Sequence, residues 1–287
     1  MSIFELKGFD SIFDSTLSSD LTDGLVEFFN WGLLQKGNYF TASLDEVNSS
    51  LSSTDGNIWS APTKGWVWEP GIAYDEAPNY VSGVYVDDEF YPLNTVGDHS
   101  YNIDYYNGNV VFDSGLPLTS EVKVEHSYKW INVEYADMNK IKHFVEDDNI
   151  SKELKVSLPN IAIEVVAKDK FKGYQLGGGQ IIDHSILIHC LADNSIVGER
   201  LADLVSFQND KTVFLFDSNR IAASGDFPTD YRGFLKENPK NYRQLVEEYP
   251  GYRLRLQNVS TFQIETKNSS LYGNTVKFDG EIVKLDI

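Results

Sequence analysis

The first clear periodicity of hydrophobic positions begins near residue 21, where apolar side chains recur every three to four residues until Gly37. These positions are Leu21, Leu25, Phe28, Phe29, Trp31 and Leu33. Such spacing places apolar side chains on one face of a helix. The Ser- and Asp-rich residues before it predict an arm, and the polar stretch 43–57 predicts a loop. Residues 1–58 are therefore expected to form an arm, a helix and a loop.

From residue 59 to residue 131 the pattern changes to short aromatic and β-branched runs separated by turn residues. Residues 121–130 alternate strictly, with Val122, Val124 and His126 on one face and charged or polar residues on the other. Asn107-Gly108 between two apolar runs is a strong hairpin signal. This segment predicts an antiparallel β-module, built as a small sandwich or barrel.

The pattern changes again at residue 132. Helical spacing is found over 137–152 and 195–207, with Ser195 as the expected N-cap. Strand-like runs cover 161–167, 180–192, 211–217, 252–265 and 275–285, and residues 168–179 are rich in turn formers. A polar excursion over 218–250 contains one charged helical piece. Residues 132–287 therefore predict an α+β domain with a mixed or antiparallel sheet and flanking helices.

Charge divides the chain in the same way. Residues 1–125 hold four Lys/Arg and 20 Asp/Glu, a net charge of −16, whereas residues 126–287 have a net charge of −3. An acidic front half does not bind the phosphate backbone of nucleic acid by counterion release. It is suited instead to repel passing DNA or to dock on a basic partner.

Motifs for cofactors, metals or catalysis are weak. The glycines at 177–179 lead into a strand without the Lys and Ser/Thr of a phosphate loop. His184 and His189 lie on one predicted strand at odd spacing, hence on opposite faces. Cys190 is expected as a buried apolar residue. We therefore expect no catalytic residue, no metal site and no cofactor, with Ca²⁺ at Asp87–Glu89 left open.

A resemblance supplies the function. The stretch GVYVDDEFYPLN, with YNIDYYNGNVVFDSGLPLTSEVKVEHSYKW, resembles a β-module in structural proteins of tailed bacteriophages. The stretch 158–205, which contains Arg200-Leu201-Ala202-Asp203, resembles tail terminators and related neck proteins. Such proteins have a strand, a turn, a long strand, a helix with an R-L-A-D-like sequence and another strand.

The resemblance implies a non-enzymatic virion protein, a subunit of a hexameric or dodecameric neck ring that joins the tail to the head connector. A head–tail connector or another tail or baseplate subunit is the alternative. Its partners would be further copies of itself and neighbouring neck, tube or sheath proteins, with packaged DNA passing nearby. No signal peptide or membrane span is expected, so assembly in the host cytoplasm follows.

For a ring subunit, the candidate residues are those at interfaces. They lie in the expected 172–180 loop, the 195–207 helix and the excursion, and they are Lys172, Tyr174, Gln175, Gln180, Arg200, Asp226, Tyr231, Arg232 and Arg243. Two other function classes remain open. A carbohydrate-binding adhesin would stack sugars on Trp66, Trp68 and Tyr74, and an acidic hydrolase would use paired carboxylates.

Overall fold

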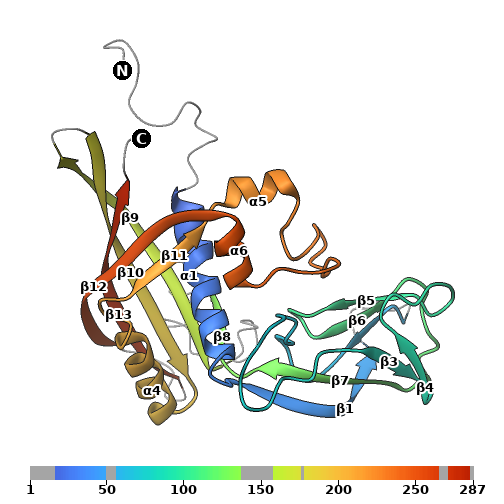
Figure 1. The fold of residues 1–287 in the computed structure, drawn as a ribbon. Helices are drawn as coiled ribbons and strands as arrows, with labels where there is room; N and C mark the ends of the chain where they lie inside the picture. The colour runs from blue at the N-terminus through green and yellow to red at the C-terminus, as the bar shows by residue number, and fades with distance from the viewer. Residues whose placement is uncertain (1–16, 50–55, 137–157, 176–177, 265–270, 285–287) are drawn as a thin grey trace.

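The computed structural model describes residues 17–49, 56–136, 158–175, 178–264 and 271–284. Over these ranges the chain forms two β-sheets and four α-helices (Figure 1). The α+β class is confirmed, as are antiparallel pairing in the first sheet and mixed pairing in the second. None of the described helices is long and apolar enough to cross a membrane.

The first sheet has seven strands in the order β4-β3-β7-β1-β2-β6-β5, and all of its pairs are antiparallel. The strands are β1 (Tyr39–Ser49), β2 (Ile58–Ser60), β3 (Gly83–Val86), β4 (Glu89–Pro92), β5 (Tyr101–Asp104), β6 (Asn109–Phe112) and β7 (Val122–Lys129). Both halves of the sheet contribute to one core, which includes Val84 and Val124 from one half and Trp59 and Val110 from the other. The predicted hairpin is present as β5–β6, with Gly108 at φ 69° in its turn.

The second sheet has six strands in the order β11-β12-β13-β10-β9-β8. Its members are β8 (Asn132–Tyr135), β9 (Asn160–Gln175), β10 (Gly178–Ala192), β11 (Thr212–Phe216), β12 (Pro250–Ile264) and β13 (Tyr272–Lys284). Only β8 and β9 pair in parallel. Apolar residues of β9, β10, β12 and β13 alternate along the strands and share one buried cluster, as periodicity of two requires.

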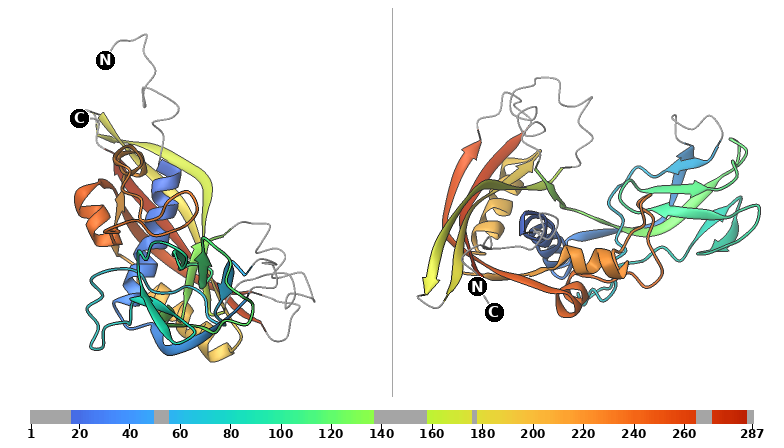
Figure 2. Two further views of the ribbon diagram at one scale, coloured as in Figure 1. Left: turned by 90° about the vertical axis from the view of Figure 1, so that its right-hand side faces the viewer. Right: turned by 90° about the horizontal axis from the view of Figure 1, so that it is seen from above.

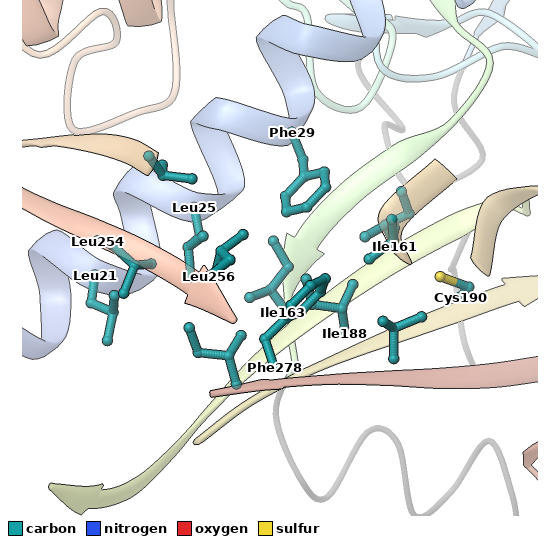
Figure 3. Packing of buried hydrophobic residues seen from close by; sticks show 14 of the residues in the cluster. Leu21, Leu25, Phe29, Ile161, Ile163, Ile188, Cys190, Leu254, Leu256 and Phe278 are labelled. Atoms are coloured by element: carbon teal, nitrogen blue, oxygen red, sulfur yellow. The ribbon is translucent and has the colours of Figure 1, made fainter. Parts of the chain in front are cut away.

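Helix α1 (Leu17–Leu34) packs into this second sheet (Figure 3). Leu21, Leu25, Phe29 and Leu33 recur every four residues on its buried face, where they meet Ile163, Leu256 and Phe278. Burial of such a stripe supplies most of the stability of a helix of this length. Helix α4 (Ser195–Ser206) packs beside β10 and β13 and belongs to the same cluster through Leu201 and Val205.

The position of α1 in the sequence does not match the sheet against which it packs. Helix α1 precedes the seven-stranded sheet in sequence but belongs to the core of the six-stranded sheet. The segment 39–129 is inserted between α1 and β8, and the two sheets lie at opposite ends of the molecule when it is seen from above (Figure 2). The 1–58 unit expected from the sequence is divided between the two sheets, because α1 joins one core and β1 joins the other.

The loop expected over 43–57 is corrected over its first part. Strand β1 continues to Ser49 and is the central strand of its sheet, with Val47 opposite Val122 and Thr41 opposite Ser127. Backbone pairing to the strongly alternating β7 overrides the turn propensity of Ser, Asp and Asn. Residues 50–55 lie outside the described ranges.

The turn-rich segment expected over 168–179 is also corrected. Strand β9 runs to Gln175 and β10 begins at Gly178, so residues 168–175 are strand. Their partners are on β10, with Lys170 opposite Asp183 and Lys172 opposite Ile181. Gly178 and Gly179 thus belong to the first residues of β10, and Gly179 has φ 89°, a conformation that favours glycine.

The helix expected over 195–207 is confirmed, but Asn194 is its N-cap in place of Ser195. The Asn194 carboxamide oxygen accepts a hydrogen bond from the backbone N–H of Ile196, 2.8 Å away. The excursion 218–250 contains α5 (Ser218–Ser224) and α6 (Tyr242–Glu248), the latter within the expected charged piece. The helix expected over 137–152 lies outside the described residues.

Candidate functional site

A cleft of about 920 Å³ lies where α1, the seven-stranded sheet, β8 and the excursion meet. Helix α1 contributes Asp23, Glu27 and Asn30 to its wall, and the loops of the seven-stranded sheet contribute residues 64–66, 68–69 and 105–107. The excursion lines the opposite side with residues 227–229, 233 and 235. The insertion of 39–129 between α1 and β8 thus creates the cleft, since it places α1 beside both sheets.

The floor of the cleft is a buried ion pair between Lys129 at the end of β7 and Glu69. The Glu69 carboxylate also accepts hydrogen bonds from the Asn30 side-chain amide and from the backbone N–H of Trp68, each 3.0 Å long. Every oxygen of this buried carboxylate has a partner, as a buried charge requires. The network joins α1 to the seven-stranded sheet.

Glu27 lies one helical turn before the residue that bridges this network, Asn30. Burial raises the pKa of the Glu27 carboxyl from 4.5 to about 7, the positive charge of Lys129 opposes the rise, and the negative charge of Glu69 adds to it. The pKa of Asp23 is also raised, by desolvation and then by Asp20. Glu27 and Asp23 are therefore carboxyl groups that lack sufficient positive charge in their surroundings.

Aromatic side chains line the rest of the cleft: Trp68, Tyr105, Tyr106, Tyr135 and Phe227. Burial raises the pKa of Tyr105 to about 12, so this phenol remains neutral. Aromatic faces beside carboxylates attract Lys and Arg side chains, through cation–π and ionic contacts together. The cleft is thus suited to bind positive charge on an apolar segment.

The structure describes no group of three or more His, Cys, Asp or Glu side chains that could hold a metal ion in the ranges that it covers. Cys190 is buried, and burial raises the pKa of its thiol to about 12. His189 contacts Glu164 at 3.2 Å and Thr275 at 2.9 Å within the sheet. These contacts satisfy a buried imidazole across three adjacent strands.

The three rings expected to stack sugars do not form one exposed surface. Trp66 is fully buried and stacks on His126, with ring centroids 4.2 Å apart. Trp68 is half-buried in the cleft, and Tyr74 is 46% exposed beside Tyr39. Trp66 is therefore part of the core, because its ring fills the space between the halves of the sheet.

The expected interface residues of the hairpin and of α4 are placed as follows. Lys172 is exposed and forms an ion pair with Asp183 on the adjacent strand. Tyr174 and Gln175 lie on β9, with side chains outside the described set, and Gln180 is half-buried on β10. Arg200 is exposed on α4. These residues belong to two separate surfaces, since α4 covers the sheet and the hairpin end extends past the helices (Figure 1).

In the excursion, Asp226 links residues that are distant in sequence. Its carboxylate pairs with Lys240 and accepts a hydrogen bond from the Tyr249 hydroxyl, and Lys240 lowers the pKa of Asp226. Tyr231 is 88% exposed and lies under the Arg232 guanidinium, 5.2 Å from the ring centroid. Arg243 pairs with Glu247 one turn along α6, at 2.8 Å. Of the excursion residues expected at an interface, Tyr231 is the most available for contact.

Sequence reasoning missed Glu27, Glu69 and Lys129. Lys129 alternates with the apolar face of β7, and Glu69 follows Trp68 in a short loop, so neither position carries a local signal of a buried ion pair. At position 27 the sequence did carry a signal: a Glu lies between apolar residues of the α1 stripe, which indicates a carboxyl group near the buried face. The chain matches no protein-family model and no curated protein sequence.

Proposed function

We propose that this chain is a non-enzymatic structural subunit of a tailed-bacteriophage virion, built into a neck ring of the tail-terminator kind. The observation that supports the proposal is the run β9–turn–β10–α4–β11. It has the order of elements found in the proteins that residues 158–205 resemble. Long paired strands of 16 and 15 residues precede a helix that packs on the same sheet.

The surfaces of the molecule agree with this role. The described residues of 39–129 carry a large excess of Asp and Glu over Lys and Arg, and they lie apart from the six-stranded sheet (Figure 2). Such a surface repels DNA and favours contact with basic protein surfaces. The exposed Tyr231, Phe207 and Phe214 add aromatic area, which is enriched at protein interfaces.

The proposal places the protein in the virion, after assembly in the host cytoplasm. Its partners are further copies of itself and the adjacent neck, tube or sheath proteins, and packaged DNA passes without specific binding. A position as head–tail connector or another tail or baseplate subunit would use the same ring-forming unit. The adhesin alternative is weaker, since Trp66 is inaccessible.

The test is the native mass of the purified chain, measured by light scattering at low and moderate salt, together with negative-stain images. Closed rings of six or twelve copies around a channel are the expected result. A chain that stays monomeric and quenches its Trp fluorescence on addition of glycan contradicts the proposal. Trp66→Phe is the companion variant. Because the Trp66 ring is buried, we expect this substitution to leave any response to glycan unchanged.

A further inference from the structure

A lysine, an asparagine and a glutamate meet at the junction of α1 and the seven-stranded sheet. The Nζ atom of Lys129 and the Nδ2 atom of Asn30 both contact the same oxygen, Oε1 of Glu69. The Asn30 contact is 3.0 Å long. Two nitrogens that share one acceptor atom lie within two hydrogen-bond lengths of each other, so the Lys129 amine and the Asn30 carboxamide are neighbours.

Water has little access to this group. Glu69 is 2% exposed, Asn30 is 9% exposed, and the side chain of Lys129 is 14% exposed. The amides of Asn79 and Asn258 also donate to carboxylates, but those two contacts are exposed. Lys129 and Glu69 therefore form a pair of poorly solvated charges with an amide beside it.

Each member of the group is held by a different element. Asn30 belongs to α1, and Lys129 lies at the end of β7, where it pairs with Tyr39 of β1 (Figure 1). In the loop that carries Glu69, the Tyr80 hydroxyl donates to the Glu69 backbone carbonyl at 2.9 Å. Groups fixed side by side in this way react as though they were at very high concentration.

A lysine side chain becomes a nucleophile only when it loses its proton. Transfer of one proton from the Lys129 ammonium to the Glu69 carboxylate gives a neutral amine and a neutral carboxyl group. This transfer removes two charges from an environment in which charges are costly. Because Glu69 contacts both nitrogens, the same carboxyl group can serve as the base for Nζ and as the acid for Nδ2.

The geometry points to an autocatalytic cross-linking activity, in which Lys129 and Asn30 form an intramolecular isopeptide bond with Glu69 as the acid–base group. Lys129 Nζ attacks Asn30 Cγ, so the Nζ–Cγ bond forms and the Cγ–Nδ2 bond breaks. Glu69 gives its proton to Nδ2 and takes the second proton from Nζ, and the leaving group departs as ammonia. The reaction consumes no oxidant, cofactor or second substrate.

The cross-link would close residues 30–129 into one covalent loop. This loop contains every strand of the seven-stranded sheet, whereas Asn30 lies on the helix that packs in the core of the six-stranded sheet. The bond therefore joins the two sheets of the subunit. Closure of a long loop stabilises a fold mainly by restricting the unfolded chain. This activity does not depend on ring assembly, so the two proposals are tested separately.

The first test is the mass of the full-length chain, folded at neutral pH and then denatured. The wild type is expected to weigh one ammonia molecule less than its sequence. Lys129→Arg retains the positive charge but has no nucleophilic amine, and Glu69→Gln lacks the acid–base group, so both are expected to keep the full mass. Circular dichroism checks that both variants are folded.

Tryptic peptides of the wild type locate the bond without any variant. Trypsin does not cleave after a lysine whose amine is acylated, so the expected product joins residues 8–36 to residues 124–140. The wild-type map therefore decides the question even if one of the variants does not fold.

Lys64→Arg is the matched control, since Lys64 lines the same cleft and this variant is expected to lose ammonia like the wild type. A folded wild-type chain that keeps its full sequence mass overturns the cross-link and leaves the ring proposal standing. Loss of ammonia within a single peptide, such as the one that contains Asn107-Gly108, also overturns it, as does a cross-linked product that persists in Lys129→Arg.

Discussion

The side-chain amide of Asn241 donates a hydrogen bond of 2.8 Å to the backbone carbonyl oxygen of Pro70, 171 positions earlier in the chain. Asn241 is also the N-cap of α6, where its carboxamide oxygen accepts from the backbone N–H of Gln244 at 2.9 Å. One buried side chain thus starts a helix of the excursion and fastens it to the loop that forms the cleft wall.

Substitution of Asn241 separates these two roles. Asn241→Ala removes the cap and leaves the Pro70 carbonyl without this donor, so we expect a loss of about 2 kcal/mol in the free energy of unfolding. Asn241→Ser retains a capping oxygen but is too short to reach Pro70, and about 1 kcal/mol is expected. Urea denaturation followed by Trp fluorescence measures both. Equal losses in the two variants would show that the capping oxygen contributes nothing beyond the Pro70 contact.

Glu27 gives the fold a definite pH dependence. Its pKa is about 7 in the folded chain and 4.5 ordinarily, so between these values the folded state binds more protons than the unfolded state. The contribution of Glu27 to the free energy of unfolding therefore falls as the pH rises through this window and is constant above it. Glu27→Gln is expected to remove that slope and to be more stable than the wild type above pH 7, by about 1 to 3 kcal/mol.

The measurement is denaturation of both proteins at several pH values across this window. Glu199→Gln, at an exposed position of α4, is the matched control and should retain the wild-type profile. A Glu27→Gln variant whose stability declines with pH as steeply as the wild type contradicts the role of Glu27.

His189 acts with the opposite sign. Burial lowers the pKa of its imidazole below 6.5, although the hydrogen bond to Glu164 opposes this. The unfolded chain therefore binds more protons between the lowered value and 6.5, so stability is complete above 6.5 and is lost as the pH falls through this window. His189→Gln is expected to flatten the acid limb and to cost about 1 to 2 kcal/mol at neutral pH.

Thermal melts of wild type and His189→Gln below and above pH 6.5 measure this effect. The same substitution at the half-exposed His99 serves as the control. If the loss of stability at acid pH is unchanged in His189→Gln but altered in the His99 variant, the role of His189 is contradicted.

Gly108 is required by both its backbone and its surroundings. Its φ is 69°, and a Cβ atom there would lie 2.1 Å from the carbonyl oxygen of Thr63. Gly108→Ala is expected to cost at least about 3 kcal/mol, since the backbone of either segment must move. Gly225 has φ 78° but no neighbour within 4 Å of such a Cβ, so Gly225→Ala should cost only about 1 kcal/mol. Similar losses at both positions would mean that φ alone decides.

The hairpin around Asn107-Gly108 was predictable because it depends on local chemistry. A turn that needs positive φ selects Gly, and the flanking apolar runs pair without distant partners. The stripe of α1 and the alternation of β7 were predictable for the same reason, since the period of each pattern is set by local geometry. The expected extent of α4 was right to within one residue at its end.

Strand β1 shows where such reasoning stops. Its sequence favours turns over residues 43–49, yet residues 45–47 pair with β7, and residues 48 and 49 pair with β2, in the middle of the sheet. Strand β7 is more than 70 positions away, and only its edge makes the strand conformation favourable. The prediction for residues 168–175 was wrong for the same reason, because pairing with β10 outweighs their polar character.

By itself the sequence determined the α+β class, the Asn107-Gly108 hairpin, the helical stripe near residue 21 and the acidic front half, because composition and short-range periodicity are local properties. Tertiary structure alone decided that α1 belongs to the distant sheet, that Trp66 is core and that Asp23, Glu27, Glu69 and Lys129 share one cleft. Those outcomes depend on which apolar faces meet across long loops and on which charges lose their water as a result, and neither is encoded by neighbours in the chain.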